Sequence, residues 1–181
     1  MSDEAARRVI LVGPTGSGKT TLGKRAAKHL NLDFVDCDEA IEARTGASVN
    51  LIFDIEGEAG FRARERRMLR ELAARDQVLI ATGGGVVTEQ RNRQLLKNAG
   101  LVVWLQVPVD QQLRRLKQDR KRPLLQTPDR RERLMAMAAQ RDPLYGEVSD
   151  LAFRSRHRGV ARAAEDLATR IEAYWKDVQH E

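Results

Sequence analysis

The residues with the clearest chemical potential lie near the beginning of the chain, where an apolar segment leads into a glycine-rich turn. Residues 9–12 are aliphatic, and residues 13–20 read Gly-Pro-Thr-Gly-Ser-Gly-Lys-Thr. This is the G-x-x-x-x-G-K-[ST] pattern of a phosphate-binding loop, whose backbone N–H groups surround phosphate oxygens. Lys19 would reach the β and γ phosphates, and the Thr20 hydroxyl could ligate Mg²⁺. An ordinary glycine-rich turn is the alternative, but the apolar segment before it and the helical segment after it favour binding of a nucleoside triphosphate.

Two carboxylates follow the second predicted strand. Asp36 and Asp38 are one residue apart, so strand alternation would place them on the same side. One could hold Mg²⁺ through water, and the other could accept a proton from a hydroxyl. An Asp before a helix is also a common N-cap, which explains either residue alone equally well. We expect the pair to be functional because it lies beside the phosphate loop, and we expect Cys37 to point into the interior.

Three consecutive glycines at 83–85 follow the third predicted strand. Open α/β sheets bind ligands at the carboxyl ends of their strands, and a turn without side chains lets a ligand approach the backbone. A flexible connection is the alternative. Further along, Pro123, Pro128 and several basic residues interrupt helical periodicity between 119 and 129. A segment of this length fits an active-site lid.

Two arginines have no assignment from the residues alone. Arg62 follows Phe61 on a predicted helix, where periodicity turns Phe61 inward and leaves Arg62 at the margin of that face. A solvated arginine is the ordinary outcome at such a position. Arg141 comes at a predicted helix end, where a cation offsets the helix dipole.

The elements that must position these residues alternate between short apolar segments and helical patterns, which is typical of βαβ units around a parallel sheet. The predicted strands are 9–12, 34–36, 78–81, 101–107 and 151–153. The predicted helices are 18–30, 38–44, 49–54, 58–75, 89–98, 110–118, 129–141 and 160–175. In the segment 58–75, helical spacing turns Phe61, Met68, Leu69 and Leu72 toward the core.

Bulk composition limits the class of protein. The chain has 181 residues, 41% hydrophobic and 32% charged, which suits one globular domain. No apolar run approaches the roughly 20 residues of a membrane helix, and the first eight residues lack the apolar core of a signal peptide. One cysteine excludes an internal disulfide and a site built from several cysteines. We therefore expect a cytoplasmic protein.

The net charge of +6 could indicate a polyanionic partner, but anionic small molecules need cations too. The excess is concentrated at 114–122, where a solvated helix face is the usual explanation. Two Trp, two Tyr and four Phe are few for a surface that stacks bases.

Taken together, several segments resemble the shikimate kinase family. They are the loop at 13–20, Asp-Cys-Asp at 36–38, Gly-Glu-Ala-Gly-Phe-Arg at 57–62, Ala-Thr-Gly-Gly-Gly-Val-Val at 81–87, Arg-Pro-Leu-Leu at 122–125 and Arg-Asp-Pro-Leu-Tyr at 141–145. They occur in the family's order and spacing across about residues 8–158. The phosphate loop is widely shared, whereas the combination of the other segments is far more particular.

The resemblance implies an α/β protein with the three-layer αβα P-loop kinase fold, built on a five-stranded parallel sheet in the order 2-3-1-4-5. It implies a single domain over 1–181, with a substrate-binding region at about 37–65 and a mobile lid at about 117–129. The implied reaction is ATP-dependent phosphorylation of the 3-hydroxyl of shikimate, with Mg²⁺ as cofactor, on the way to chorismate and the aromatic amino acids. ATP and shikimate are the expected partners. We expect a monomer that binds neither nucleic acid nor membranes.

The resemblance also assigns roles on the acceptor side. Asp38 would orient the accepting hydroxyl and act as its base, while Arg62 and Arg141 would clamp the substrate carboxylate. Guanidinium groups suit this role because they pair bidentately with carboxylates. The glycine turn would complete the substrate site through Gly83, Gly84 and Gly85, with the Gly84 backbone meeting the ring hydroxyls.

On the nucleotide side, Thr20 would bind Mg²⁺ together with Asp36, which would act through water. ATP would be bound by Gly16, Ser17, Gly18, Lys19, Thr20, Thr21, Arg115 and Arg122. Arg115 would stack on the adenine, and Arg122 would neutralise phosphate charge from the lid. Lys19, Asp38 and Arg122 would be the catalytic residues. A second adenine contact is expected near 154–158, but the resemblance does not assign it to a residue.

Two other functions remain open at this point. A different small-molecule kinase, acting on gluconate or a nucleotide, would use the same scaffold, and gluconate would share the carboxylate clamp. A nucleotide-dependent switch that binds nucleic acid would use the basic segment 114–122 and would show steep salt dependence. It would leave Asp36, Asp38 and the glycine turn without a task.

Overall fold

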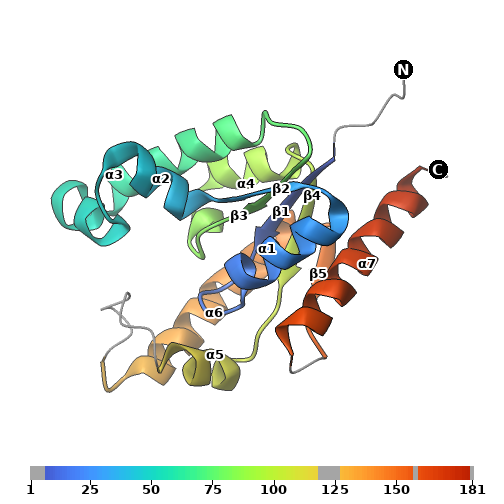
Figure 1. The fold of residues 1–181 in the computed structure, drawn as a ribbon. Helices are drawn as coiled ribbons and strands as arrows, with labels where there is room; N and C mark the ends of the chain where they lie inside the picture. The colour runs from blue at the N-terminus through green and yellow to red at the C-terminus, as the bar shows by residue number, and fades with distance from the viewer. Residues whose placement is uncertain (1–6, 118–126, 157–158, 180–181) are drawn as a thin grey trace.

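The computed structural model describes residues 7–117, 127–156 and 159–179, and within them a five-stranded sheet forms the centre of the molecule (Figure 1). In chain order the strands are β1 (Arg8–Val12), β2 (Asp33–Asp36), β3 (Val78–Ala81), β4 (Leu101–Leu105) and β5 (Leu151–Phe153). Neighbouring strands are parallel, and their order is β2-β3-β1-β4-β5. The predicted fold class and strand order are confirmed.

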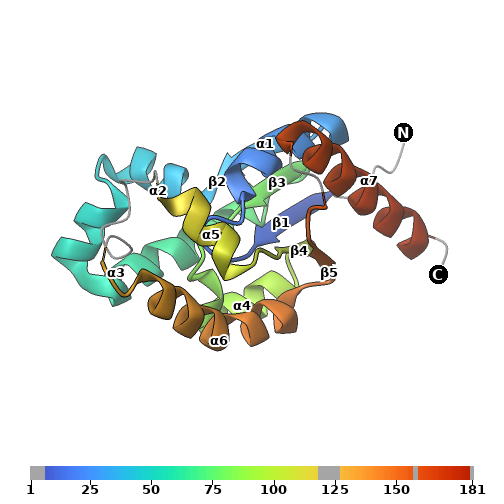
Figure 2. The same cartoon turned by 90° about the horizontal axis from the view of Figure 1, so that it is seen from below.

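Helices cover both faces of this sheet (Figures 1 and 2). They are α1 (Lys19–Leu30), α2 (Cys37–Thr45), α3 (Val49–Leu72), the 3-10 helix η1 (Val86–Thr88), α4 (Gln90–Lys97), α5 (Val109–Leu116), α6 (Arg130–Val148) and α7 (Val160–Val178). Helices α1 and α7 pack on one face, while α3, α4 and α6 cover the other. The arrangement has the three layers that the resemblance implied.

The side chains of β1 explain why both faces of the sheet are covered. Ile10 and Val12 belong to the core cluster under α3, α4 and α6, whereas Val9 and Leu11 belong to the cluster under α1 and α7. All four side chains are fully buried, as expected for the central strand of a parallel sheet. Because the strands are parallel, the turns after β1, β2 and β3 meet at one edge.

Helix α3 joins two helices that we predict separately at 49–54 and 58–75. Gly57 lies between them with φ 71° and ψ −179°, outside helical geometry, so the helix is kinked at this residue. The positive φ favours glycine over any residue with a Cβ. The break was therefore predicted at the right place, although no loop separates the two parts.

Most element ends agree with the prediction to within about three residues, but α6 differs more. Helix α6 continues past the predicted end at 141 to Val148 and contains Pro143. Proline removes one helical hydrogen bond, but Leu144, Tyr145 and Val148 pack into the core, and this packing stabilises the helix beyond Pro143. Strand β4 ends at Leu105 instead of 107, and η1 was not predicted. Among the helices described, none is long and apolar enough to cross a bilayer.

Candidate active site

A cavity of about 450 Å³ opens at the carboxyl edge of the sheet and collects most of the residues singled out from the sequence. Its lining includes Gly16, Gly18, Lys19, Thr20, Thr21, Asp36, Asp38, Arg62, Gly83, Gly84, Gly85, Arg115 and Arg141. Ser17 is buried beside it, with its hydroxyl 3.4 Å from Lys19 Nζ. Arg122 and most of the predicted lid at 117–129 lie outside the described residues.

The phosphate loop is held in shape by contacts among its own residues. Gly13 has φ 146°, and a Cβ there would stand 2.6 Å from Leu105 O, so the loop requires glycine at this turn. Lys19 Nζ donates hydrogen bonds to Gly13 O at 2.7 Å and to Pro14 O at 3.0 Å. The Lys19 side chain is largely buried, so its charge is concentrated at the cavity wall.

The start of α1 is suited to an anion. Gly18 is the N-cap residue, and within this described helix no side chain caps the first turn and no acidic residue lies in it. The first N–H groups of a helix have no partner within the helix and carry the positive end of its dipole. Phosphate oxygens are the groups that such a loop and helix start bind best.

Asp36 has two tasks at once. Its Oδ1 accepts hydrogen bonds from the N–H groups of Asp38 and Glu39 at 3.0 and 3.1 Å, which caps α2. Its Oδ2 accepts one from the Thr20 hydroxyl at 2.6 Å, which joins β2 to the phosphate loop. The N-cap alternative is confirmed for Asp36, and its contact with Thr20 places it beside the phosphate loop, while its role at Mg²⁺ stays a prediction.

Asp38 lines the cavity as predicted, but it is positioned by a helix and not by the end of a strand. Strand β2 ends at Asp36, so Asp38 lies in the first turn of α2, and strand alternation does not position it. Its carboxylate faces the glycine turn, because a Cβ on Gly83 would be 3.2 Å from Asp38 Oδ1. Cys37 is fully buried as expected, and burial raises the pKa of its thiol.

Arg62 is buried instead of lying solvated at the margin of its helix, which corrects the expectation drawn from periodicity. Its Nη1 donates to Glu65 Oε2 at 2.8 Å, and its Nε lies 3.6 Å from Glu58 Oε1. A Cβ on Gly85 would overlap the guanidinium. Because Gly85 has no side chain, the guanidinium of Arg62 can occupy this space.

Glu65 is a site residue that the sequence analysis missed. It is fully buried, lines the cavity, and has its Oε1 3.1 Å from the position of a Cβ on Gly83. Burial raises the pKa of Glu65 to about 7, with the nearby Asp38 charge adding to the rise and Arg62 and Arg141 opposing it. A charged residue on the apolar face that carries Phe61, four residues before it, was the available signal.

Arg141 and Tyr145 lie one turn apart on α6. Arg141 lines the cavity from the middle of that helix, so the expectation that it compensates the dipole of a helix end is wrong. Tyr145 is fully buried, and its hydroxyl donates to Gly84 O at 2.5 Å. Helix α6 and the glycine turn are thereby joined next to the cavity.

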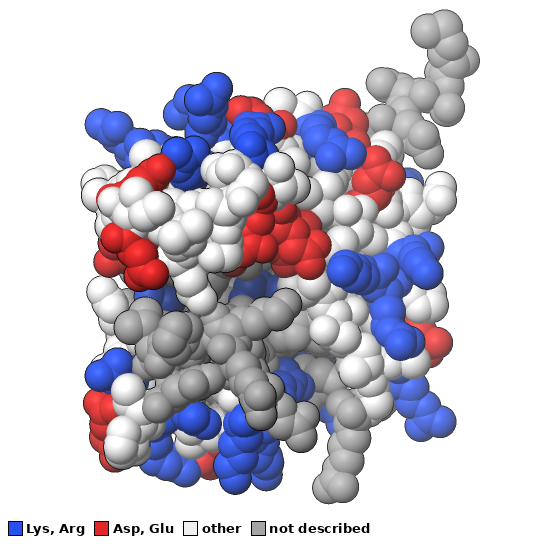
Figure 3. All heavy atoms as spheres, turned by 60° about the vertical axis from the view of Figure 1, so that its left-hand side comes forward, with Lys and Arg blue, Asp and Glu red and all other residues white. Residues whose placement is uncertain are grey.

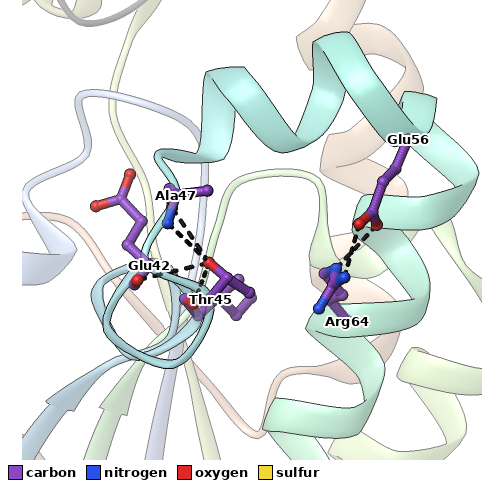
Figure 4. A network of polar contacts seen from close by, with 6 residues as sticks. Glu42, Thr45, Ala47, Glu56 and Arg64 are labelled. Carbon is purple, nitrogen blue, oxygen red and sulfur yellow. Dashed lines mark hydrogen bonds and ion pairs between the residues drawn. The ribbon is translucent and has the colours of Figure 1, made fainter.

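The outer wall of the cavity comes from the two parts of α3. Val49, Phe53 and Phe61 line it, and the two phenyl rings stack with centroids 4.6 Å apart. Figure 4 shows the polar contacts that support this wall. Glu56 accepts two hydrogen bonds from Arg64 across the kink, at 2.8 and 2.6 Å.

At the start of α3, Glu42 Oε1 accepts from Val49 N at 2.8 Å. The Thr45 hydroxyl bridges the end of α2 and the connection that follows, through Ile41 O at 2.9 Å and Ala47 N at 3.3 Å (Figure 4). These contacts lie within the predicted substrate-binding region at 37–65.

Helix α5 packs over the phosphate loop. Gln112 is buried and donates to Thr15 O at 2.8 Å, and Arg115 Nη1 donates to Gly16 O at 2.7 Å. Partial burial lowers the pKa of Arg115. On the face drawn in Figure 3, basic side chains alternate with acidic ones instead of forming one continuous basic surface. The segment 154–158, near which a second adenine contact is expected, lies partly outside the described residues.

The sheet order, the phosphate loop and the cavity beside it define a P-loop kinase. A family model described as Shikimate kinase matches residues 15–172. The chain belongs to the shikimate kinase family and is an enzyme of the kinase class.

Individual relatives agree with the family model. The chain is 54% identical over 158 residues to a shikimate kinase of Halorhodospira halophila, covering 86% of this chain and 89% of that protein. It is 49% identical over 162 residues to a shikimate kinase of Chromohalobacter salexigens, covering 90% of each. A solved shikimate kinase from Acinetobacter baumannii in complex with shikimate superposes with a TM-score of 0.89 at 41% identity, covering 94% of this chain and 96% of that one.

Proposed function

We propose that the chain transfers the γ-phosphoryl group of ATP to the 3-hydroxyl of shikimate, a step in aromatic amino acid biosynthesis. One observation carries this proposal. A single cavity is lined by Lys19 of the phosphate loop, by Asp38, and by Arg62 and Arg141. A phosphate donor and a small acidic acceptor can therefore meet in one cavity, as phosphoryl transfer requires.

Asp38 is the proposed base. The 3-oxygen of the acceptor forms a bond to the γ-phosphorus while the bond from that phosphorus to the β–γ bridging oxygen breaks. The hydroxyl proton passes to the Asp38 carboxylate, and ADP leaves with the bridging electrons. The position of Asp38 beside Gly83 supports this role, because a hydroxyl can then lie against backbone that carries no side chain.

Arg62 and Arg141 are proposed to bind the acceptor's carboxylate from opposite elements, α3 and α6. Two guanidinium groups on one carboxylate fix its orientation as well as its position. Gly83, Gly84 and Gly85 would add backbone contacts. Phe53 and Phe61 would exclude water from the ring, which limits wasteful hydrolysis of ATP.

On the nucleotide side, Lys19 would exchange its bonds to loop carbonyls for bonds to the β and γ phosphates. Gly16, Ser17, Gly18 and Thr21 would surround the phosphates, and Arg115 would stack on the adenine. For Arg122, a role in neutralising phosphate charge stays a prediction from the resemblance, as does the lid at 117–129.

Thr20 and Asp36 fit a magnesium site. Their hydroxyl and carboxylate are hard oxygen donors, they line the same cavity, and they already contact one another. Thr20 would bind the ion directly and Asp36 through water. Bound there with ATP, Mg²⁺ would offset phosphate charge.

We further propose that the chain acts as one domain and a monomer in the cytoplasm. Residues 37–65 would form the acceptor-binding region, in keeping with the stacked wall and the polar contacts around α2 and α3. A sedimentation measurement of the purified chain would test the monomer, and a dimer across the dilution range would reject it.

ADP release measured with shikimate, gluconate and a nucleoside monophosphate as separate acceptors tests the proposed function. We expect shikimate-dependent turnover at least 100-fold above the others, since a site built for one acid and its hydroxyls leaves polar groups unpaired with an analogue. NMR of the product should show phosphorus coupled to the proton at carbon 3. Equal turnover with gluconate, or none with shikimate, would reject the proposal.

A further inference from the structure

Tyr145 has no role in the reaction described above, although it contacts the glycine turn at the wall of the cavity. It is among the largest fully buried side chains of the molecule, and its ring lies beside Trp104, with centroids 5.9 Å apart. Its hydroxyl makes one hydrogen bond to a backbone oxygen, Gly84 O, at 2.5 Å. That oxygen belongs to the glycine turn at the cavity wall.

We propose that Tyr145 is a positioning residue for the acceptor, and that its hydroxyl locks the Gly84–Gly85 peptide with the Gly85 N–H turned toward the substrate carboxylate. This inference rests on the proposed function. Gly84 and Gly85 line the large cavity, whereas Tyr145 lies behind them and lines a smaller one with Thr15 and Gln112. The carbonyl is thus drawn to the side away from the acceptor.

The peptide geometry supplies the next step. The described peptide bonds are trans, and in a trans peptide the C=O and N–H groups point in opposite directions. A carbonyl held toward Tyr145 therefore directs the Gly85 N–H away from α6 and toward the cavity. The guanidinium of Arg62 occupies the space where a Gly85 side chain would be, so this N–H and Arg62 border the same region.

A tether is needed here because the turn has no side chains of its own. A peptide between two glycines rotates at little steric cost, so both orientations are open to it. The neighbouring peptides are held by Val86 N to Gly83 O at 3.2 Å and Thr88 N to Gly85 O at 3.1 Å. Tyr145 supplies the bond to the carbonyl that lies between them.

The hydroxyl is suited to a permanent donor role. Burial raises the pKa of Tyr145 to about 12, with Arg141 opposing the rise, so the group keeps its proton across the working pH range. Tyr145 also lies one helical turn after Arg141. One helix would thereby set both an arginine of the clamp and the orientation of the backbone donor.

Tyr145→Phe removes the hydroxyl and keeps the ring. We expect the shikimate KM to rise about tenfold, the ordinary effect of losing one hydrogen bond, while kcat and the ATP KM stay within about twofold. Tyr174→Phe, which alters the other tyrosine far along α7, should leave all three constants unchanged. An unchanged shikimate KM in Tyr145→Phe, or an equal rise in both KM values, would overturn the inference.

A measurement on the unaltered enzyme covers the case in which Tyr145→Phe does not fold. With ¹⁵N-glycine labelling, shikimate should shift the Gly85 amide proton downfield, as expected when an N–H donates to a carboxylate. Absence of a shift at Gly85, with shikimate bound and turned over, would overturn the role of Tyr145 and leave the proposed function intact. Absence of shikimate turnover in the unaltered enzyme would instead reject the proposed function itself.

Discussion

The two halves of the site are built in different ways. The phosphate loop is local, because Lys19 contacts Gly13, Pro14 and Ser17 within a few residues of itself. The acceptor half combines α2, two parts of α3, the turn after β3 and α6, which lie up to about 100 residues apart. A local loop can be recognised from its pattern, whereas a dispersed pocket depends on packing. In the proposed reaction the first would serve the chemical step and the second the selection of the acceptor.

The largest expected effect breaks the local half. Lys19→Ala should lower kcat/KM by about a thousandfold or more, because a buried cation on the transferring phosphate acts most strongly in the transition state. Lys24→Ala, an exposed lysine on the same helix, is the matched control and should change little. Near-normal turnover in Lys19→Ala would remove the phosphate loop from the mechanism.

The next effect separates chemistry from binding on the acceptor side. Asp38→Asn should lower kcat by roughly 100-fold or more, the usual range for loss of a general base, with the ATP dissociation constant almost unchanged. Stopped-flow turnover and calorimetric titration with ATP measure the two quantities. Asp33→Asn at the exposed start of β2 serves as control. An unaltered kcat would contradict the base role.

The clamp should respond mainly in acceptor binding. Arg141→Gln and Arg62→Gln should each raise the shikimate KM by about 10- to 100-fold, as expected for loss of a hydrogen bond to a charged group. The ATP KM should stay nearly constant, so the two halves would be distinguished within one data set. Arg70→Gln, on the outer face of α3, should be neutral. A constant shikimate KM in either clamp variant would argue against that residue.

Glu65 should make the stability of the folded enzyme depend on pH. Its pKa is raised from the ordinary 4.5 to about 7, so the folded state keeps a proton that the unfolded state has lost between these values. The free energy of unfolding should therefore fall as pH rises from about 4.5 to 7, by about 3 kcal/mol relative to Glu65→Gln. Urea titrations of both proteins across this range test it, and parallel curves would refute the protonated buried carboxyl.

The smallest effect concerns the outer wall. Glu56→Gln weakens the exposed pair with Arg64 across the kink, and exposed ion pairs contribute little and are screened by salt. We expect the shikimate KM to rise less than about threefold and the difference to shrink at high salt. Glu71→Gln, which weakens exposed ion pairs to Arg44 on α2 and to Arg67 on α3, is the control. A salt-independent or larger change would mean that the pair does more than support the wall.

Much of the fold could be predicted because its signals are periodic and local. The five strands were found from short apolar segments, and the break in α3 was found at the right place. The end of α6 was not, since Pro143 signals an end by local rules while Tyr145 and Val148 are held by the core. At Pro143, core packing therefore outweighed the low helix propensity of proline.

The part of the cavity around Arg62 and Glu65 was harder to predict from the sequence than the fold. Periodicity placed Arg62 at a solvated margin, but the absence of a side chain on Gly85, distant in sequence, gives its guanidinium a buried position. The position of Glu65 on the apolar face of Phe61 marked it as unusual, but the sequence did not show that Arg62 and Asp38 lie beside it.

The sequence by itself was enough to predict the phosphate loop, the strand positions and the family. The loop and the strands follow from preferences that act over a few neighbouring residues, and the family follows from short motifs. Only the tertiary structure decided that Arg62 and Arg141 line one cavity, that Glu65 is buried beside Arg62, and that Tyr145 donates a hydrogen bond to the glycine turn. These features arise where separate segments meet, and the low polarity created by that meeting changes the pKa values and contacts of the groups enclosed.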